Sequence, residues 1–137
     1  MKHAVKPAVP LAEKPAMKPP TEAQLAGQGA ESRARSLLEQ AGLRFVAANV
    51  RYKVGELDLV MNDGAALVFV EVRARRSAAF GGAAGSIDWR KRLRLRHAAS
   101  RYLLERFGQR GWPPCRFDVV AFEAGAPNWI RGAFDAD

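Results

Sequence analysis

The chain has 137 residues, a formal net charge of +8 and an isoelectric point of about 10.4. This length supports a single domain with a hydrophobic core, and the charge favours an anionic partner, first of all nucleic acid. Arginine, whose guanidinium contacts phosphate bidentately, supplies 16 of the 22 basic residues. No apolar stretch approaches the ~20 residues of a membrane span. The single cysteine, Cys115, excludes an internal disulfide, so we expect a cytoplasmic protein without membrane association.

The first 20 residues differ in composition from the rest of the chain. The stretch MKHAVKPAVPLAEKPAMKPP holds five of the eight prolines and four lysines. Such a composition predicts a disordered, basic arm over residues 1–20, followed by one domain over residues 21–137. A solvated tail is favoured over an arm that contacts nucleic acid. The oligomeric state is left open by the sequence, with a dimer as one option.

Beyond the arm, helical and strand-like patterns alternate. A first helix is predicted in GAESRARSLLEQAG, where Ala34, Leu37 and Leu38 have helical spacing and Gly42 is a natural stop. A long basic helix follows a glycine-rich loop, FGGAAGS, and is predicted to begin at Ser86 or Asp88. The full order is helix, strand 43–52, the hairpin 55–76, helix 86–108, strand 115–123 and a short strand at 129–134. This αβββαβ order predicts a mixed sheet flanked by helices.

The second helix has a clear inner face and clear ends. Gly108 is predicted to terminate it, and the inward positions include Leu95, Ala99, Tyr102 and Leu103. Trp89, in its first turn, is predicted either to stack against bases or to cap the core.

The hairpin GELDLVMNDGAALVFVEVRARR carries acids among apolar residues. If Asp63 and Gly64 form a two-residue turn, Asp58 lies opposite Phe69 and Glu71 lies one diagonal step further on. In this register Asp58, Glu71 and Arg73 share one face of the sheet. The other face is apolar: Leu57, Leu59, Met61, Val68, Val70 and Val72.

Two interpretations of the clustered acids stand equally on this geometry. Diagonal neighbours lie ~7–8 Å apart, a span that two carboxylates can bridge through a cation. A salt-bridge cluster with Arg73 or another arginine would also satisfy them, and buried carboxylates need a partner of some kind. Glu31 falls on the inward stripe of the first helix with Ala34 and Leu38. It is therefore either part of the same site or an N-terminal acid that opposes the helix dipole.

These motifs resemble a known family. Gly29-x-Glu31-x-x-Ala34, GELDLV at 55–60, VFVEVR at 68–73 and CRFDVVAF resemble the YraN-like family of predicted endonucleases. That family is similar to the PD-(D/E)xK nuclease superfamily, in the branch of archaeal Holliday-junction resolvases. The resemblance implies a restriction-endonuclease-like αβββαβ core. It also implies that Asp58 and Glu71 are the motif acids and that Glu31 is the helix acid.

The implied activity is hydrolysis of phosphodiester bonds in duplex, branched or flapped DNA. Mg²⁺ or Mn²⁺ would be held by Asp58, Glu71 and Glu31, since hard cations prefer carboxylate oxygens. The superfamily places a lysine two residues after the second acid, where this chain has Arg73. Arginine stabilises phosphate charge but is not deprotonated in proteins. Lys91 or Lys53 is expected to supply the amine; otherwise the chain is a non-catalytic nucleic-acid-binding module that keeps the nuclease fold.

A basic segment follows the hairpin. From Arg73 to Arg96 there are eight basic residues and one acid, Asp88. Solvated helix faces usually mix charges, so this run predicts phosphate contacts, assisted by the glycine-rich loop at a helix N-terminus. Asp118, in the fourth strand, is expected either to pair with an arginine or to support the site, and support is preferred. The predicted nucleic-acid contacts are Arg73, Arg75, Arg76, Arg90, Lys91 and Arg94.

Overall fold

The computed structural model describes residues 22–75 and 87–134, without the side chains of residues 22–28 and 75. The predicted N-terminal arm, Arg76 and the FGGAAGS loop lie outside the described residues. The elements are α1 (Glu22–Gln40), β1 (Arg44–Tyr52), β2 (Gly55–Asp63), β3 (Ala66–Arg75), α2 (Trp89–Phe107), β4 (Cys115–Glu123) and β5 (Ala126–Phe134).

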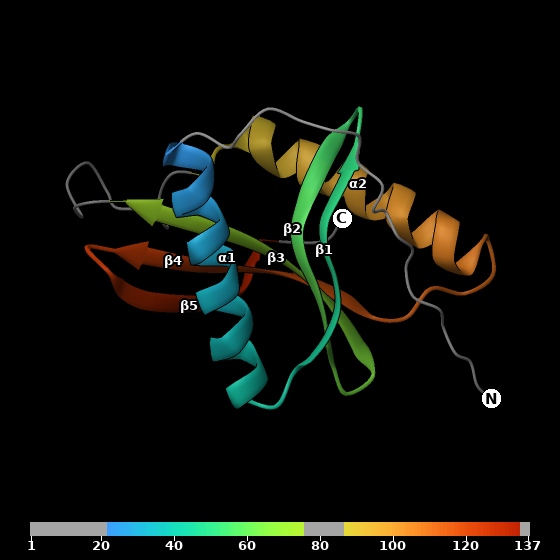
Figure 1. Cartoon of the computed structure of the whole chain (residues 1–137). Helices are drawn as coiled ribbons and strands as arrows, with labels where there is room; N and C mark the ends of the chain where they lie inside the picture. The colour runs from blue at the N-terminus through green and yellow to red at the C-terminus, as the bar shows by residue number, and fades with distance from the viewer. Residues whose placement is uncertain (1–21, 76–86, 135–137) are drawn as a thin grey trace, which may run out of the picture.

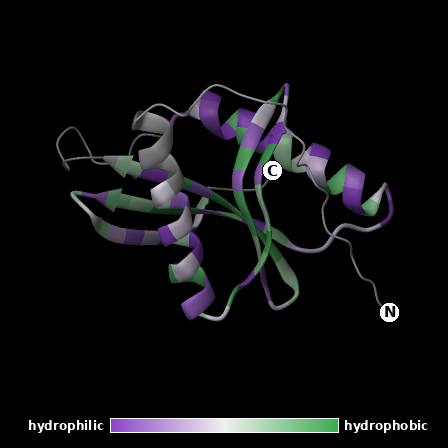
Figure 2. Ribbon diagram, viewed as in Figure 1, coloured by the Kyte–Doolittle hydropathy of each residue, from purple (hydrophilic) through white to green (hydrophobic). Residues whose placement is uncertain are grey.

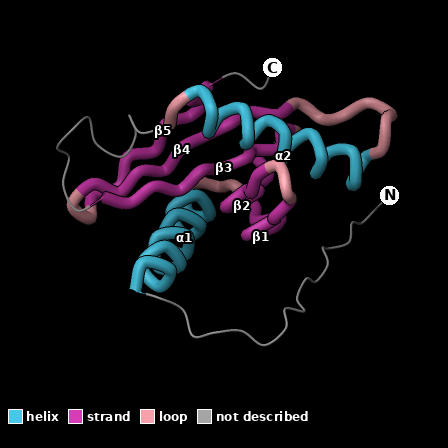
Figure 3. The backbone as a smooth tube through the Cα atoms, turned by 90° about the horizontal axis from the view of Figure 1, so that it is seen from above, coloured by secondary structure: helices cyan, strands magenta, loops and turns pink. Residues whose placement is uncertain are grey.

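The five strands form one mixed sheet in the order β1-β2-β3-β4-β5 (Figure 1). Strands β3 and β4 are parallel and are joined through α2, whereas the other three pairings are antiparallel. Helices α1 and α2 lie on opposite faces of the sheet (Figure 3). The predicted αβββαβ core is confirmed. Among the described residues, no helix is long and apolar enough to span a membrane.

Each helix covers its own hydrophobic cluster, and apolar residues concentrate along the central strands (Figure 2). On the α1 side, Ala34 and Leu38 pack against Leu59, Met61 and Val70. On the α2 side the cluster includes Leu57, Val60, Phe69, Leu95 and Tyr102. The prediction that Leu57 shares a face with Leu59 is therefore wrong, because the simple alternation of sides breaks in β2 around Asp58.

Helix α2 has the ends and the inner face that its sequence predicts. Asp88 is the N-cap, and its Oδ1 accepts a hydrogen bond of 2.9 Å from the backbone N–H of Lys91. Gly108, at φ 66°, is the C-cap, and its N–H donates to the Leu104 carbonyl. The inward positions Leu95, Ala99, Tyr102 and Leu103 are all buried. Trp89 is 61% exposed, so its predicted alternative role as a core cap is wrong.

The hairpin turn lies one residue later than predicted. Asp63 pairs with Ala66, so Gly64 and Ala65 form the turn, and Phe69 lies opposite Val60 rather than Asp58. Gly64, at φ 63°, takes the first central position, where a type II′ turn places its glycine. The prediction assumed an Asp-Gly turn with glycine second. The pairing is shifted by two residues, an even number, so the shift by itself does not exchange the two faces of the hairpin.

Helix α1 begins earlier than its apolar pattern indicates. It starts at Glu22, so Glu31 lies in its middle rather than in its first turn. The interpretation of Glu31 as an N-terminal acid opposing the helix dipole is therefore wrong. The inward stripe is confirmed, because Ala34 and Leu38 are fully buried.

Candidate active site

The candidate site lies where β2 and β3 separate, a place that we call the fork. Their backbone pairing ends at Leu59 and Val70, and Figure 1 shows the two strands running apart beyond this pair. The next step of the register sets Asp58 level with Glu71. Asp58 Oδ2 accepts a hydrogen bond of 2.9 Å from the backbone N–H of Val72. The carboxylate of Asp58 thus takes the place of a backbone partner for Val72 at the fork.

Glu71 is buried and is approached by two cations. Its Oε2 lies 3.5 Å from Lys91 Nζ and 3.6 Å from Arg73 Nε. Its Oε1 is buried and has no hydrogen-bond partner in the part of the chain that the structure describes. A buried carboxylate oxygen without a partner costs free energy, so this atom is suited to a ligand that is a cation or a hydrogen-bond donor.

The two carboxyl groups at the fork disfavour simultaneous ionisation. Burial raises the pKa of Glu71, and the negative charge of Asp58 raises it further. Burial also raises the pKa of Asp58, against the lowering effect of the Val72 N–H and of a hydrogen bond with Glu71. Two neighbouring carboxyl groups whose charges repel each other are more stable when one of them is protonated. The pair therefore tends to retain one proton, which a divalent cation would displace.

Glu31 extends the acidic cluster from α1. Burial, followed by the charge of Asp58, raises its pKa to about 7. A hydrogen bond with the Asn49 side chain acts in the opposite direction. The structure thus brings Glu31 into electrostatic contact with Asp58, as the inward stripe of the helix predicts.

The sequence interpretation missed Asn49. It lies within β1 at φ 53°, a left-handed conformation that asparagine tolerates better than most residues. Its neighbours Ala48 and Val50 pair with Leu59 and Leu57, so Asn49 is level with Asp58. Backbone strain of this kind concentrates at functional sites. The signal available in the sequence was a polar residue interrupting the pattern of a strand.

Of the two lysines expected to supply the amine, the structure brings one to the acids. Lys91, in the first turn of α2, contacts Glu71, and its charge lowers the pKa of Asp58 against the effect of burial. Lys53 is exposed in the turn between β1 and β2. Arg73 occupies the motif position and pairs with the carboxylate two residues before it in the same strand.

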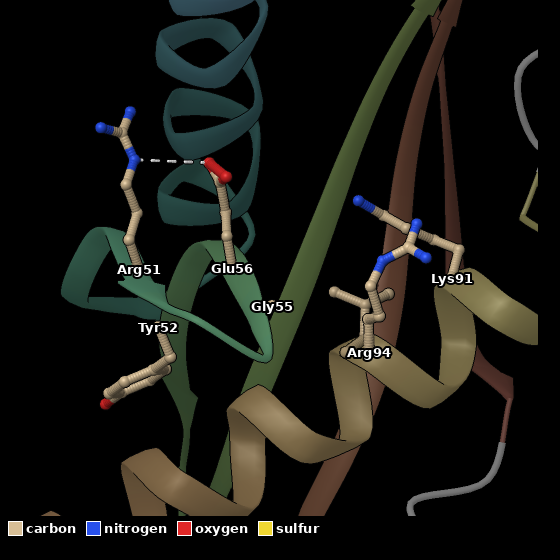
Figure 4. Close-up of a pocket in the computed structure, with 7 residues that line it drawn as sticks. Arg51, Tyr52, Gly55, Glu56, Lys91 and Arg94 are labelled. Atoms are coloured by element: carbon tan, nitrogen blue, oxygen red, sulfur yellow. Dashed lines mark ion pairs between the residues drawn. The ribbon is translucent and has the colours of Figure 1, made fainter.

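A hollow of about 260 Å³ adjoins the site between the β1–β2 turn and α2 (Figure 4). Lys91 belongs both to this hollow and to the carboxylate site. Arg51 lines the hollow on the side opposite α2. The sequence interpretation missed it, because no motif or spacing near Arg51 distinguishes it from other arginines. The lining residues are Arg51, Tyr52, Gly55, Glu56, Lys91, Arg94 and Leu95.

The predicted nucleic-acid contacts are only partly described. Arg90 and Arg94 are exposed on α2, and the Arg90 guanidinium lies 5.1 Å from the centroid of the exposed Trp89 ring. Arg73 and Lys91 are directed to Glu71. The side chain of Arg75 is not described, and Arg76 lies outside the described residues.

Asp118 belongs to a separate, structural network. It is fully buried and receives hydrogen bonds from Arg116, from Trp129 Nε1 at 3.0 Å and from the Gly132 N–H at 3.0 Å. Arg116 also donates to Asp63 at 2.8 Å. Asp118 therefore pairs with an arginine and ties β4 to β5. None of these hydrogen bonds joins Asp118 to Glu71. The structure therefore does not support the preferred interpretation, in which Asp118 supports the acids of the site.

The acids suit a cation that needs few protein ligands. Within residues 22–75 and 87–134, no group of three or more His, Cys, Asp or Glu side chains is arranged to hold a metal ion. Mg²⁺, however, is typically held by one or two carboxylates together with waters and substrate phosphate oxygens. Asp58 and Glu71, with the unpartnered Oε1 of Glu71, fit that smaller donor set. Glu31 is not needed as a third direct ligand.

The fold and the site define an α/β protein with an αβββαβ core and, beside a lysine, a pair of carboxylates of which Glu71 is buried and Asp58 half-buried. The chain belongs to the family described as "Uncharacterised protein family UPF0102", whose model matches residues 30–122. A UPF0102 protein of Xanthomonas oryzae pv. oryzae is 54% identical over 120 residues, covering 86% of this chain and 98% of that protein. One from Serratia proteamaculans is 54% identical over 111 residues, covering 81% and 95%. One from Burkholderia vietnamiensis is 59% identical over 114 residues, covering 81% and 77%.

Proposed function

We propose that the protein is a Mg²⁺- or Mn²⁺-dependent DNA endonuclease. The observation that carries the proposal is the contact of 3.5 Å between Lys91 Nζ and Glu71 Oε2, beside Asp58 at the fork of β2 and β3. Two acids and a lysine are the group that the resemblance to PD-(D/E)xK nucleases implies. The lysine comes from a different element than in that motif, but its amine reaches the second acid.

The residues divide the chemical work as follows. Asp58 and Glu71 would hold the divalent cation, which when bound supplies charge neutralisation and acidifies water. Lys91 and Arg73, which both contact Glu71, would stabilise negative charge on the phosphoryl oxygens of a strand at the fork. Glu31, with a pKa of about 7, is suited to accept a proton from the attacking water, because a general base works best near the operating pH.

The surface around the fork supports an extended phosphate ligand. Arg90 and Arg94 are exposed on α2, the helix that delivers Lys91 to Glu71. Trp89 is exposed in the first turn of the same helix and offers a ring for base stacking. Exposed bases occur at branches and flaps, so this tryptophan favours duplex DNA with such features over uninterrupted duplex.

A second candidate function is a nucleic-acid-binding module without catalysis. It is favoured by the pairing of Glu71 with both Arg73 and Lys91, because two cations can compensate the carboxylate without a metal. The basic surface of α2 would serve this function equally well.

A cleavage assay separates the two functions. Purified full-length protein would be incubated with labelled linear, flapped and four-way DNA in Mg²⁺, in Mn²⁺ and in EDTA, alongside Asp58→Asn. The endonuclease proposal expects metal-dependent cutting that Asp58→Asn abolishes. Binding without cutting in every metal condition would leave the binding module as the function.

A further inference from the structure

We propose that the hollow between the β1–β2 turn and α2 is a binding subsite for a second backbone phosphate of the same nucleic-acid strand. The inference rests on the proposed nucleic-acid ligand and adds a position and a set of residues to it. Its key residues are Arg51 and Arg94, which lie on opposite walls of the hollow.

The charge of the hollow selects an anion. Arg51, Lys91 and Arg94 line it, against one acid, Glu56. Glu56 Oε2 lies 3.6 Å from Arg51 Nε, in an exposed pair that contributes little to stability and can rearrange around a ligand. Arg94 makes no ion pair with the residues that the structure describes. Figure 4 shows Lys91 and Arg94 on α2 and Arg51 and Glu56 on the strands across the hollow.

The two walls are held at a fixed separation. A Cβ atom on Gly55 would lie 2.5 Å from the backbone oxygen of Arg94, so only glycine allows the turn to approach α2 this closely. Further along the helix, Tyr52 Oη donates a hydrogen bond of 2.9 Å to Glu105. These two contacts fix the hollow as a built feature of the fold rather than a gap between mobile side chains.

The size of the hollow and its position identify the ligand as part of a larger molecule. Its volume of about 260 Å³ is below the ~300–1,000 Å³ typical of small-molecule sites, which favours a phosphate group presented by a polymer. Lys91 lines the hollow and also contacts Glu71, so one lysine borders both places. A nucleic-acid strand carries a charge about every 3.4 Å of axial rise, so neighbouring phosphates of one strand suit two adjoining sites.

A methylphosphonate scan tests the subsite. Single phosphates around the branch of a flapped duplex would be replaced by neutral methylphosphonate, and dissociation constants would be measured in Ca²⁺, so that the result does not depend on cleavage. In the wild-type protein, one or two positions should weaken binding roughly tenfold, as expected for the loss of a charge-assisted contact. The hollow variant is the double substitution Arg51→Gln/Arg94→Gln. In this variant, methylphosphonate at one or more of those positions should change the dissociation constant by less than about twofold.

The control is Arg35→Gln/Arg110→Gln, which removes the same charge from exposed arginines that do not line the hollow. It should retain the sensitivity of every wild-type position. If the hollow variant also retains every sensitivity, the subsite is overturned even where the protein cuts DNA. If a phosphate position loses its sensitivity in the hollow variant but no DNA is cut in Mg²⁺, the subsite stands and the endonuclease proposal falls. If no DNA is bound, both fall.

Discussion

Lys91 Nζ lies 3.5 Å from Glu71 Oε2, and this contact joins the first turn of α2 to the middle of β3. Asp88, as the N-cap, fixes the residue at which α2 begins. It therefore also fixes the position of Lys91 relative to β3. This arrangement places an amine beside the second acid without a lysine in β3. Arg73 is at the position where the resemblance implies a lysine, and Lys91 supplies the amine from α2.

Replacing Lys91 by methionine should lower the rate of DNA cleavage by about 10²–10³-fold, the usual effect of removing one group that stabilises transition-state charge. The aliphatic stem is retained, so the fold should persist. Single-turnover cleavage at saturating protein measures the effect. Lys53→Met is the matched control and should cut normally. Equal rates in wild type and Lys91→Met would exclude a catalytic role for Lys91.

Arg73→Lys would restore the residue order of the superfamily motif and should preserve or raise the cleavage rate. A lysine at this position keeps the positive charge near Glu71, while its smaller ammonium leaves more room at the fork. The same single-turnover assay measures the outcome. A loss comparable to that of Lys91→Met would show that the guanidinium of Arg73 is itself required.

Asp58→Asn should abolish cleavage yet retain or strengthen DNA binding. Asparagine keeps an oxygen that can accept the Val72 N–H bond while removing one negative charge that repels phosphate. It also relieves the repulsion with Glu71, so the metal-free protein should melt at a higher temperature. Fluorescence anisotropy and thermal melting measure the two effects. Weaker DNA binding by a folded variant would argue against phosphate at the fork.

The metal-free protein should lose stability as the pH rises from 4.5 through about 7. Glu31 has a folded-state pKa of about 7 against an ordinary value of 4.5, so the folded state binds more protons than the unfolded state in this window. The raised pKa values of Asp58 and Glu71 act in the same direction. Urea unfolding at several pH values measures the slope. Glu31→Gln should flatten it, and an unchanged slope in that variant would contradict the assignment to Glu31.

Asp118→Ala should destabilise the protein by about 2–4 kcal/mol, because it removes one of the two carboxylate partners of Arg116 and leaves the Trp129 and Gly132 N–H groups without their acceptor. Asp118→Asn, which can still accept hydrogen bonds, should cost less. Chemical denaturation measures both. Cleavage per folded molecule should not change, and a selective loss of cleavage in Asp118→Asn would restore the interpretation of Asp118 as a support for the active site.

The sequence predicted those features that depend on local signals. Asp88 and Gly108 are capping residues, and the burial of Leu95 and Leu103 follows from helical spacing. The turn was misplaced because a single glycine suits either of two primed turns, and the choice depends on how the strands pair. The early start of α1 was missed because its first turns lack a strong apolar stripe.

The candidate site was predictable in its acids but not in its surroundings. Asp58 and Glu71 stand out as charges among apolar residues of one hairpin, whereas the choice between Lys91 and Lys53 required the packing of α2 on the sheet. Asn49 is marked in the sequence only as a polar residue within a strand pattern, and Arg51 is not marked at all. Both were missed because they gain their position at the site through the β1–β2 pairing, which spacing and composition do not give.

The most direct test of the central claim is a calorimetric titration of Mn²⁺ into the wild-type protein, with and without a flapped DNA. A cation held by Asp58 and Glu71 predicts binding at millimolar or lower concentration that DNA strengthens. It also predicts a measured binding enthalpy that changes with the ionisation enthalpy of the buffer, because the carboxyl pair gives up its shared proton to the buffer. Asp58→Asn should abolish this binding. If no divalent cation binds to the wild-type protein even with DNA present, the carboxylate pair is a salt-bridged structural feature and not a metal-dependent nuclease centre.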